Sequence, residues 1–316
     1  MHSGLKSNIV IKPTKSGGIV FVKNGVKIPA KYDNVTATFL RNTTIGKKPN
    51  QVQTIEHLMA ALFVRRVNNA EIEIDNDETP ILDGSAMEFL NFLKNIKPTG
   101  KLPYLRVKKE VIVRQSEVAL PLWLRIFNFI RGKKLDGFVK LSPIKGNKLE
   151  VIAELDYPII VIGRQKYDFV FDYGNFTKSA SDFIKNVAKS RTFGTMAEWE
   201  WLKKKGMGRG ANGTNVIAIN EAGDDTLNDM FHKGGSAKRE IMEKYGHLLP
   251  PGGGIVKRHY PDEFVRHKII DAVGDLYMSG FFIIGKMEIY KGGHALNNLI
   301  LKKLFKETSN YDIIKA

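Results

Sequence analysis

Residues 264–276 constrain the fold most strongly, because their apolar positions recur near the helical period. On such a helix His267 and Asp271 stand four residues apart and meet on one face, and Asp275 follows one turn later. An imidazole and a carboxylate at this spacing provide two ligands for a metal. A solvated His–Asp pair has the same spacing and is the commoner arrangement, so this segment alone leaves both interpretations open.

The composition limits both the kind of protein and the kind of metal site. The chain has 316 residues, 43% of them hydrophobic, which is enough for two domains or one large one. It has no cysteine, so disulfides and thiolate metal sites are excluded, and His, Asp and Glu remain as metal ligands. The net charge of +16 favours an anionic partner such as nucleic acid, an acidic membrane face or a phosphate-bearing small molecule. No transmembrane helix or signal peptide is expected.

Hydrophobic patterning divides the chain into two halves, each running through strands, a helix, a strand and a helix. In the first half we expect strands at 8–12, 18–22, 26–29, 35–40 and 70–75, helices at 54–63 and 87–93, and a boundary strand at 105–113. In the second half we expect strands at 148–155, 167–172, 215–220 and 281–290, and helices at 179–188, 198–205, 264–276 and from 294 onward. Thr54 is the expected N-cap of the first helix.

Three of the seven histidines stand in settings that suit a catalytic metal site. His57 directly follows Glu56 at a helix start, His267 is paired with Asp271, and His294 follows two glycines, where a backbone can approach a ligand closely. Two histidines and one carboxylate leave an open position on a tetrahedral zinc, as a hydrolytic zinc requires. Glu56 is then a carboxylate beside a ligand, suited to taking a proton from the attacking water.

Five motifs closely resemble those of the UDP-3-O-acyl-N-acetylglucosamine deacetylase family of lipid A biosynthesis, and they follow one another in the family's order. They are TIEHLMAAL (54–62), ILDGSA (81–86), SRTFG (190–194), DEFVRHKIIDAVGDL (262–276) and GHALNN (293–298). The resemblance implies a zinc-dependent amidase of Gram-negative bacteria. Such an enzyme removes the acetyl group from the glucosamine nitrogen of a UDP-sugar that already carries a 3-O-acyl chain.

The resemblance also implies roles for nine matching positions. The implied zinc ligands are His57, His267 and Asp271. The implied catalytic residues are Glu56 as general base, Thr192 as the hydroxyl that stabilises the tetrahedral intermediate, His294 as the cation that protonates the leaving amine, and Asp275 as its support. The implied substrate contacts are Phe193 and Lys268. One Zn²⁺ per chain is expected, although Fe²⁺ also suits two histidines and one carboxylate.

The fold implied by the resemblance is α+β, with two similar domains that each layer a β-sheet against helices and an active site between them. We expect the first domain at residues 1–112, supplying the base and the first zinc ligand, and the second at residues 113–316, supplying the rest. A βαβ element that follows Phe193 is expected to form an apolar passage for the acyl chain. Trp199 and Trp201 are the candidates to line it.

Three features depart from the family pattern. A strand ending in Gly-x-Gly-Leu usually precedes the His-Ser-Gly sequence, whereas here His2 directly follows Met1, so we expect an exposed sheet edge. The segments near residues 117–137 and 230–260 are longer than the corresponding connections in the family, so we expect insertions there. One of the two is expected to act as a lid or a membrane contact.

The expectations for partners and location follow from these features. We expect a cytoplasmic monomer that binds a UDP-linked acylated glucosamine and no nucleic acid, and peripheral contact with the inner membrane stays open. Two alternatives also stay open: an inactive or N-terminally truncated homologue, and a basic nucleic-acid-binding protein. Only the charge supports the latter, since no recognised nucleic-acid-binding motif is evident.

Overall fold

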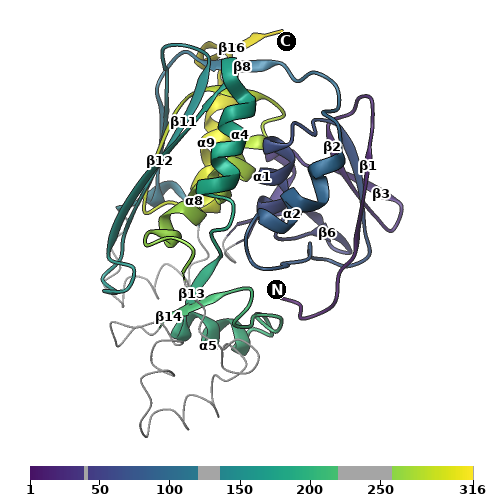
Figure 1. Cartoon of the computed structure of the whole chain (residues 1–316), viewed down its shortest axis with the longest axis vertical. Helices are drawn as coiled ribbons and strands as arrows, with labels where there is room; N and C mark the ends of the chain where they lie inside the picture. Colours follow the sequence, from purple (N-terminus) through teal and green to yellow (C-terminus); the bar gives the residue numbers. More distant parts are fainter. Residues whose placement is uncertain (39–41, 120–135, 220–257, 316) are drawn as a thin grey trace, which may run out of the picture.

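The computed structural model describes residues 1–38, 42–119, 136–219 and 258–315. Helices lie between a four-stranded sheet and a seven-stranded sheet, which confirms the expected α+β class (Figure 1). The insertions expected near 117–137 and 230–260 fall largely outside the described residues. Within the described ranges, no helix has the length and apolar character needed to cross a membrane.

The first half of the chain builds the four-stranded sheet and a smaller three-stranded one. The four-stranded sheet has the order β1-β7-β2-β3, with β7 antiparallel to β1 and parallel to β2. Its strands are β1 (Ile9–Pro13), β2 (Ile19–Lys23), β3 (Val26–Pro29) and β7 (Ala70–Ile74). Alternate side chains of β2 and β7 are buried, so one face of the sheet covers the core. The remaining elements are β4 (Val35–Ala37), β5 (Thr44–Lys47), β6 (Asn50–Val52), α1 (Glu56–Val64) and α2 (Met87–Phe92).

The second half builds the seven-stranded sheet, with β12-β11-β15-β10-β9 in order and β8 pairing with both β15 and β16. Its strands are β8 (Tyr104–Val107), β9 (Val111–Arg114), β10 (Phe138–Ser142), β11 (Lys148–Asp156), β12 (Arg164–Asp172), β15 (Phe282–Tyr290) and β16 (Tyr311–Ile314). The accompanying helices are α4 (Phe176–Asn186), α8 (Glu263–Tyr277) and α9 (His294–Lys306). The seven-stranded sheet thus already begins at residue 104, and a domain division at residue 112 stays a prediction.

A separate βαβ element lies at one end of the molecule (Figure 1). It consists of β13 (Phe193–Thr195), α5 (Met196–Lys204) and β14 (Ile217–Ile219), and its two strands pair in parallel. Thr195 caps α5 through a capping box with Glu198, in which each side chain bonds the other's backbone N–H. The βαβ element expected after Phe193 is therefore present.

The contact between α1 and α8 joins the two halves of the chain. Gly274 makes this contact close: a Cβ atom there would lie 2.0 Å from the Glu56 carbonyl oxygen and 3.2 Å from the Ala60 nitrogen. Only a residue without a side chain allows the two helix backbones to approach this far. Because α1 carries Glu56 and His57 and α8 carries His267, Asp271 and Asp275, this packing brings the distant motifs together.

Two expectations for local structure were wrong, and four strands were not predicted. Helix α1 begins after Ile55, and the Thr54 hydroxyl donates to Glu78 Oε1 at 3.0 Å instead of capping the helix. Thr54 has a φ of 59°, outside the extended region that N-cap residues adopt. The strand expected at 105–113 is split into β8 and β9, and no strand was predicted where β5, β6, β10 and β16 lie.

Candidate active site

Eight of the nine sequence-predicted site residues line one cavity of about 260 Å³. They come from the first turn of α1, from α8, from the start of α9 and from the chain entering β13. The eight residues are Glu56, His57, Thr192, Phe193, His267, Lys268, Asp271 and His294. Asp275 lies behind this lining and contacts His294. Segments more than 200 residues apart in the sequence therefore converge on one site.

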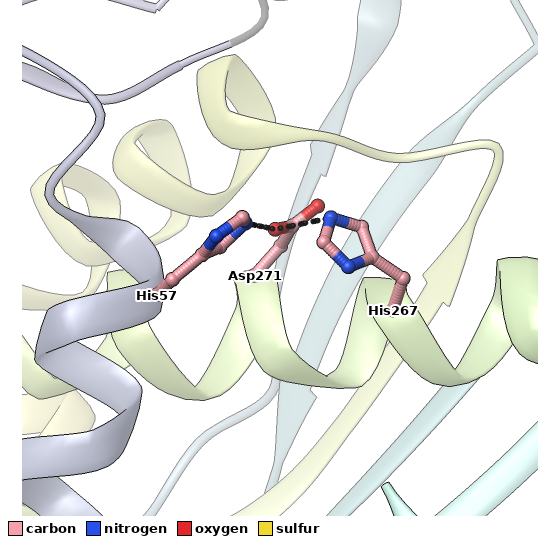
Figure 2. Close-up of side chains that lie close together, drawn as sticks. All are labelled: His57, His267 and Asp271. Atoms are coloured by element: carbon pink, nitrogen blue, oxygen red, sulfur yellow. Dashed lines mark ion pairs between the residues drawn. The ribbon is translucent and has the colours of Figure 1, made fainter. Parts of the chain in front are cut away.

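Three side chains in the cavity lie close enough together to hold a metal ion (Figure 2). Asp271 Oδ1 lies 3.6 Å from His57 Nε2 and 3.4 Å from His267 Nε2, so the carboxylate oxygen stands between the two imidazoles. The imidazole rings are nearly perpendicular, with centroids 4.9 Å apart. All three residues are buried, which excludes the solvated His–Asp pair that the spacing alone had left open.

The chemistry of these three residues fits a divalent metal. Asp271 Oδ1 is buried without a hydrogen-bond partner among the described residues, and a buried carboxylate oxygen is normally satisfied. His267 Nδ1 lies 3.0 Å from the Ser190 carbonyl oxygen, an acceptor that requires Nδ1 to carry the proton. The lone pair of His267 is then on Nε2, which faces Asp271 and His57. A backbone acceptor of this kind is the usual partner of a metal-binding histidine.

The ionisation states also suit metal binding. Burial lowers the pKa of His267 to about 3, against the opposing effect of Asp271, so its imidazole is neutral at physiological pH. Burial raises the pKa of Asp271, but Lys268, His267 and His294 together outweigh it and hold that pKa well below its usual range. Lys268 Nζ lies 2.9 Å from Asp271 Oδ2. The cluster thus offers a neutral imidazole at His267 and an ionised carboxylate at Asp271, the forms that bind a metal.

Glu56 and His294 lie next to each other beside the cluster. His294 Nε2 lies 3.8 Å from Glu56 Oε1, and His294 Nδ1 lies 2.8 Å from Asp275 Oδ2. Burial lowers the pKa of His294, but Asp275, Glu56 and Asp271 outweigh it and raise that pKa to about 9. Burial raises the pKa of Glu56 above its ordinary value, against His294 and His57. At neutral pH His294 is therefore an imidazolium, and it lies next to the Glu56 carboxyl, whose pKa is above its ordinary value.

The remaining predicted residues, Thr192, Phe193 and Lys268, also line the cavity. The Thr192 N–H donates to the Gly84 carbonyl at 2.8 Å, which ties this segment to the first half of the chain. The Phe193 ring packs edge-on against Phe264 of α8, with centroids 4.8 Å apart. Lys268 Nζ lies 5.5 Å from the centre of the Phe193 ring. Of the two candidate tryptophans, Trp199 lines the cavity and Trp201 is not among the lining residues.

Sequence reasoning missed three residues that shape the site. Ser190 acts through its carbonyl, and a backbone acceptor leaves no signal in residue type. The Asn297 amide donates to Asp275 Oδ2 at 2.9 Å, and only a helix start at His294 brings it there. Gly274 did leave a signal, because a glycine inside a helical pattern costs stability and usually marks close packing.

Comparisons with known proteins agree with this geometry. A family model described as UDP-3-O-acyl N-acetylglycosamine deacetylase matches residues 1–234 and 231–306. The chain is similar to a protein of Shewanella violacea, with 31% identity over 322 residues that cover 99% of this chain and 88% of the relative. It is also similar to a protein of Myxococcus xanthus, with 32% identity over 100% of this chain and 85% of that relative. A relative from Wolinella succinogenes is 30% identical over 99% of this chain and 88% of its own length. All three relatives are named UDP-3-O-acyl-N-acetylglucosamine deacetylase.

Proposed function

Because the chain belongs to the UDP-3-O-acyl N-acetylglycosamine deacetylase family, we propose that it hydrolyses the N-acetyl group of UDP-3-O-acyl-N-acetylglucosamine in lipid A biosynthesis. Water adds to the acetyl carbon, the carbon–nitrogen bond breaks, and acetate and the free amine leave. The observation that carries the proposal is the buried cluster of His57, His267 and Asp271 in one cavity with Glu56 and His294.

We propose Zn²⁺ as the metal held by His57, His267 and Asp271. When bound, zinc supplies a Lewis acid that polarises the amide carbonyl and lowers the pKa of water. The two histidines and the carboxylate, with no cysteine in the chain, are the donor set of catalytic zinc sites that leave one position open. Fe²⁺ is the alternative for this donor set, and metal analysis of the purified protein distinguishes the two.

Glu56 acts as general base and His294 as general acid in this proposal. An amide is a poor electrophile with a poor leaving group, so a proton must be taken from the attacking water and another given to the amine nitrogen. The Glu56 carboxylate accepts the first proton. The His294 imidazolium, held by Asp275, stabilises the developing oxyanion and then donates the second proton. A group that is charged at neutral pH because of its raised pKa suits this role.

Thr192, Phe193 and Lys268 are proposed to hold the substrate. The Thr192 hydroxyl donates to the developing oxyanion, a contribution of about 3 kcal/mol per donor in other oxyanion holes. Phe193 presents an apolar ring, and Lys268 a cation, at the cavity wall. The positive charge of the chain favours a UDP-linked substrate. A monomeric state, a cytoplasmic location, peripheral membrane contact and the absence of a nucleic-acid partner stay predictions.

A pair of histidine substitutions tests the proposal. His267→Ala removes a proposed ligand, and we expect both bound zinc and acetate release to be lost. His259→Ala is the matched control, because His259 is exposed and lies outside the cavity. Full zinc content and full acetate release in His267→Ala, measured by elemental analysis and a coupled acetate assay, would contradict the assignment.

A further inference from the structure

A residue outside the nine predicted positions contacts both Glu56 and Asp275, the carboxylate that holds His294. Thr43 is buried and directly precedes β5 in the first half of the chain. Its N–H donates to Glu56 Oε2 at 3.0 Å. Its hydroxyl donates to Asp275 Oδ1 at 2.6 Å, across 232 residues of sequence.

Thr43 and His294 contact different oxygens of the same two carboxylates, those of Glu56 and Asp275. Thr43 binds one oxygen of each, and His294 faces the other oxygen of each: Glu56 Oε1 at 3.8 Å and Asp275 Oδ2 at 2.8 Å. A carboxylate held at one oxygen by a fixed donor cannot rotate freely about its terminal bond. Thr43 therefore fixes which oxygen of Glu56 and which oxygen of Asp275 face the imidazole.

Thr43 is buried, and its backbone contacts the residue before α1. Its carbonyl oxygen lies 3.5 Å from the nitrogen of Ile55, the residue that immediately precedes α1. Asp275 also accepts the Asn297 amide at 2.9 Å, so three donors surround this carboxylate. Hydrogen bonds to a charged group are among the strong ones, and in a buried site their geometry is well defined.

We propose that Thr43 is a positioning residue that aligns the Glu56 carboxylate and the Asp275–His294 pair through one backbone and one hydroxyl hydrogen bond. This inference rests on the proposed function for its effect on rate. Thr43 does not line the cavity and is not expected to touch substrate. Its removal therefore changes kcat and leaves KM and metal content near their wild-type values.

The test compares Thr43→Val, which removes the hydroxyl and keeps the shape and the N–H, with Thr43→Ser, which keeps the hydroxyl. Thr44→Val is the matched control, because Thr44 is equally buried and its hydroxyl donates to Asn42 Oδ1 at 3.3 Å. We expect kcat for acetate release to fall about 10-fold or more in Thr43→Val, since a hydrogen bond to a charged group is lost. Thr43→Ser restores most of kcat, and Thr44→Val resembles the wild type.

Three outcomes overturn the proposal: a wild-type kcat in Thr43→Val, an equal loss in Thr43→Val and Thr43→Ser, or a loss of kcat that follows a loss of bound metal. A second measurement does not depend on activity. The NMR resonance of the His294 Nδ1–H proton, assigned by its absence from His294→Gln, is expected to shift in Thr43→Val and to stay in place in Thr43→Ser and Thr44→Val. If the wild type releases no acetate, the proposed function fails while this resonance still decides the role of Thr43; an unshifted resonance in Thr43→Val contradicts it.

Discussion

Substitution of Gly274 by alanine tests whether the contact between α1 and α8 assembles the metal site. The new Cβ would lie 2.0 Å from the Glu56 carbonyl oxygen, whereas Cβ atoms essentially never come closer than 3.0 Å to another heavy atom. The two helices must therefore separate by about 1 Å. Overpacking of this kind destabilises a protein by about 1–3 kcal/mol, and the higher helix propensity of alanine offsets up to about 1 kcal/mol of that.

We expect Gly274→Ala to weaken zinc binding by more free energy than it lowers the free energy of unfolding. His57 is on α1, while His267 and Asp271 are on α8, so a 1 Å separation displaces one ligand from the other two. Metal–ligand distances tolerate deviations of only about 0.2 Å. Structural zinc sites bind with about 10–16 kcal/mol over four ligands, so misplacing one ligand costs about 3 kcal/mol, or about 100-fold in Kd.

The assay is zinc titration against a competing chelator, together with thermal unfolding of the metal-free protein. Gly174→Ala is the control, because Gly174 is exposed in the turn before α4 and its Cβ would meet only the end of the Asp172 side chain, at 3.2 Å. We expect weaker zinc binding in Gly274→Ala only. Unchanged zinc affinity together with unchanged stability in Gly274→Ala would refute the argument that this glycine sets the helix spacing.

Four further predictions concern the acid–base pair and the framework around it. Glu56→Gln is expected to lower kcat about 100-fold to 10,000-fold while zinc content stays at one per chain, because a general base is removed and no ligand is; retention of activity in Glu56→Gln would exclude Glu56 as the base. The pH profile of kcat/KM is expected to rise as Glu56 ionises, at a pKa above its ordinary value, and to fall as pH rises through about 9, where His294 loses its proton. Asp275→Asn removes the largest contribution that raises the pKa of His294, so the alkaline limb is expected to move to lower pH with zinc retained, and loss of the metal itself would mean that Asp275 is misassigned. Glu263→Gln breaks the buried ion pair with Arg191, whose Nε lies 2.9 Å from Glu263 Oε1, and is expected to lower the unfolding free energy by about 3 kcal/mol in chemical denaturation; a change below 1 kcal/mol would contradict a structural role for the pair.

The sequence predicted the order of the main elements and the four-residue spacing of His267 and Asp271 on α8. The spacing of His267 and Asp271 held in the structure because an i, i+4 separation survives any packing of the helix. Burial was less predictable. Residues 264–276 look amphipathic, yet α8 is enclosed on nearly all sides because it packs between the seven-stranded sheet and α1.

What the sequence could not give depends on contacts across the chain. Thr54 looked like an N-cap, but the buried Glu78 competes for its hydroxyl and holds it away from α1. Thr43 and Ser190 act at distances of 232 and 77 residues from their partners, and no local pattern marks them. The β8–β9 break at residues 108–110 follows from pairing with different neighbours: β8 with β15 and β16, and β9 with β10.

The most direct test of the central claim is acetate release from UDP-3-O-acyl-N-acetylglucosamine by the purified chain, before and after treatment with a metal chelator. We expect release by the metal-loaded protein, loss of release after chelation, and recovery when about one Zn²⁺ per chain is restored. Release that is unaffected by complete metal removal, or no release by protein that holds one zinc per chain, would contradict the claim.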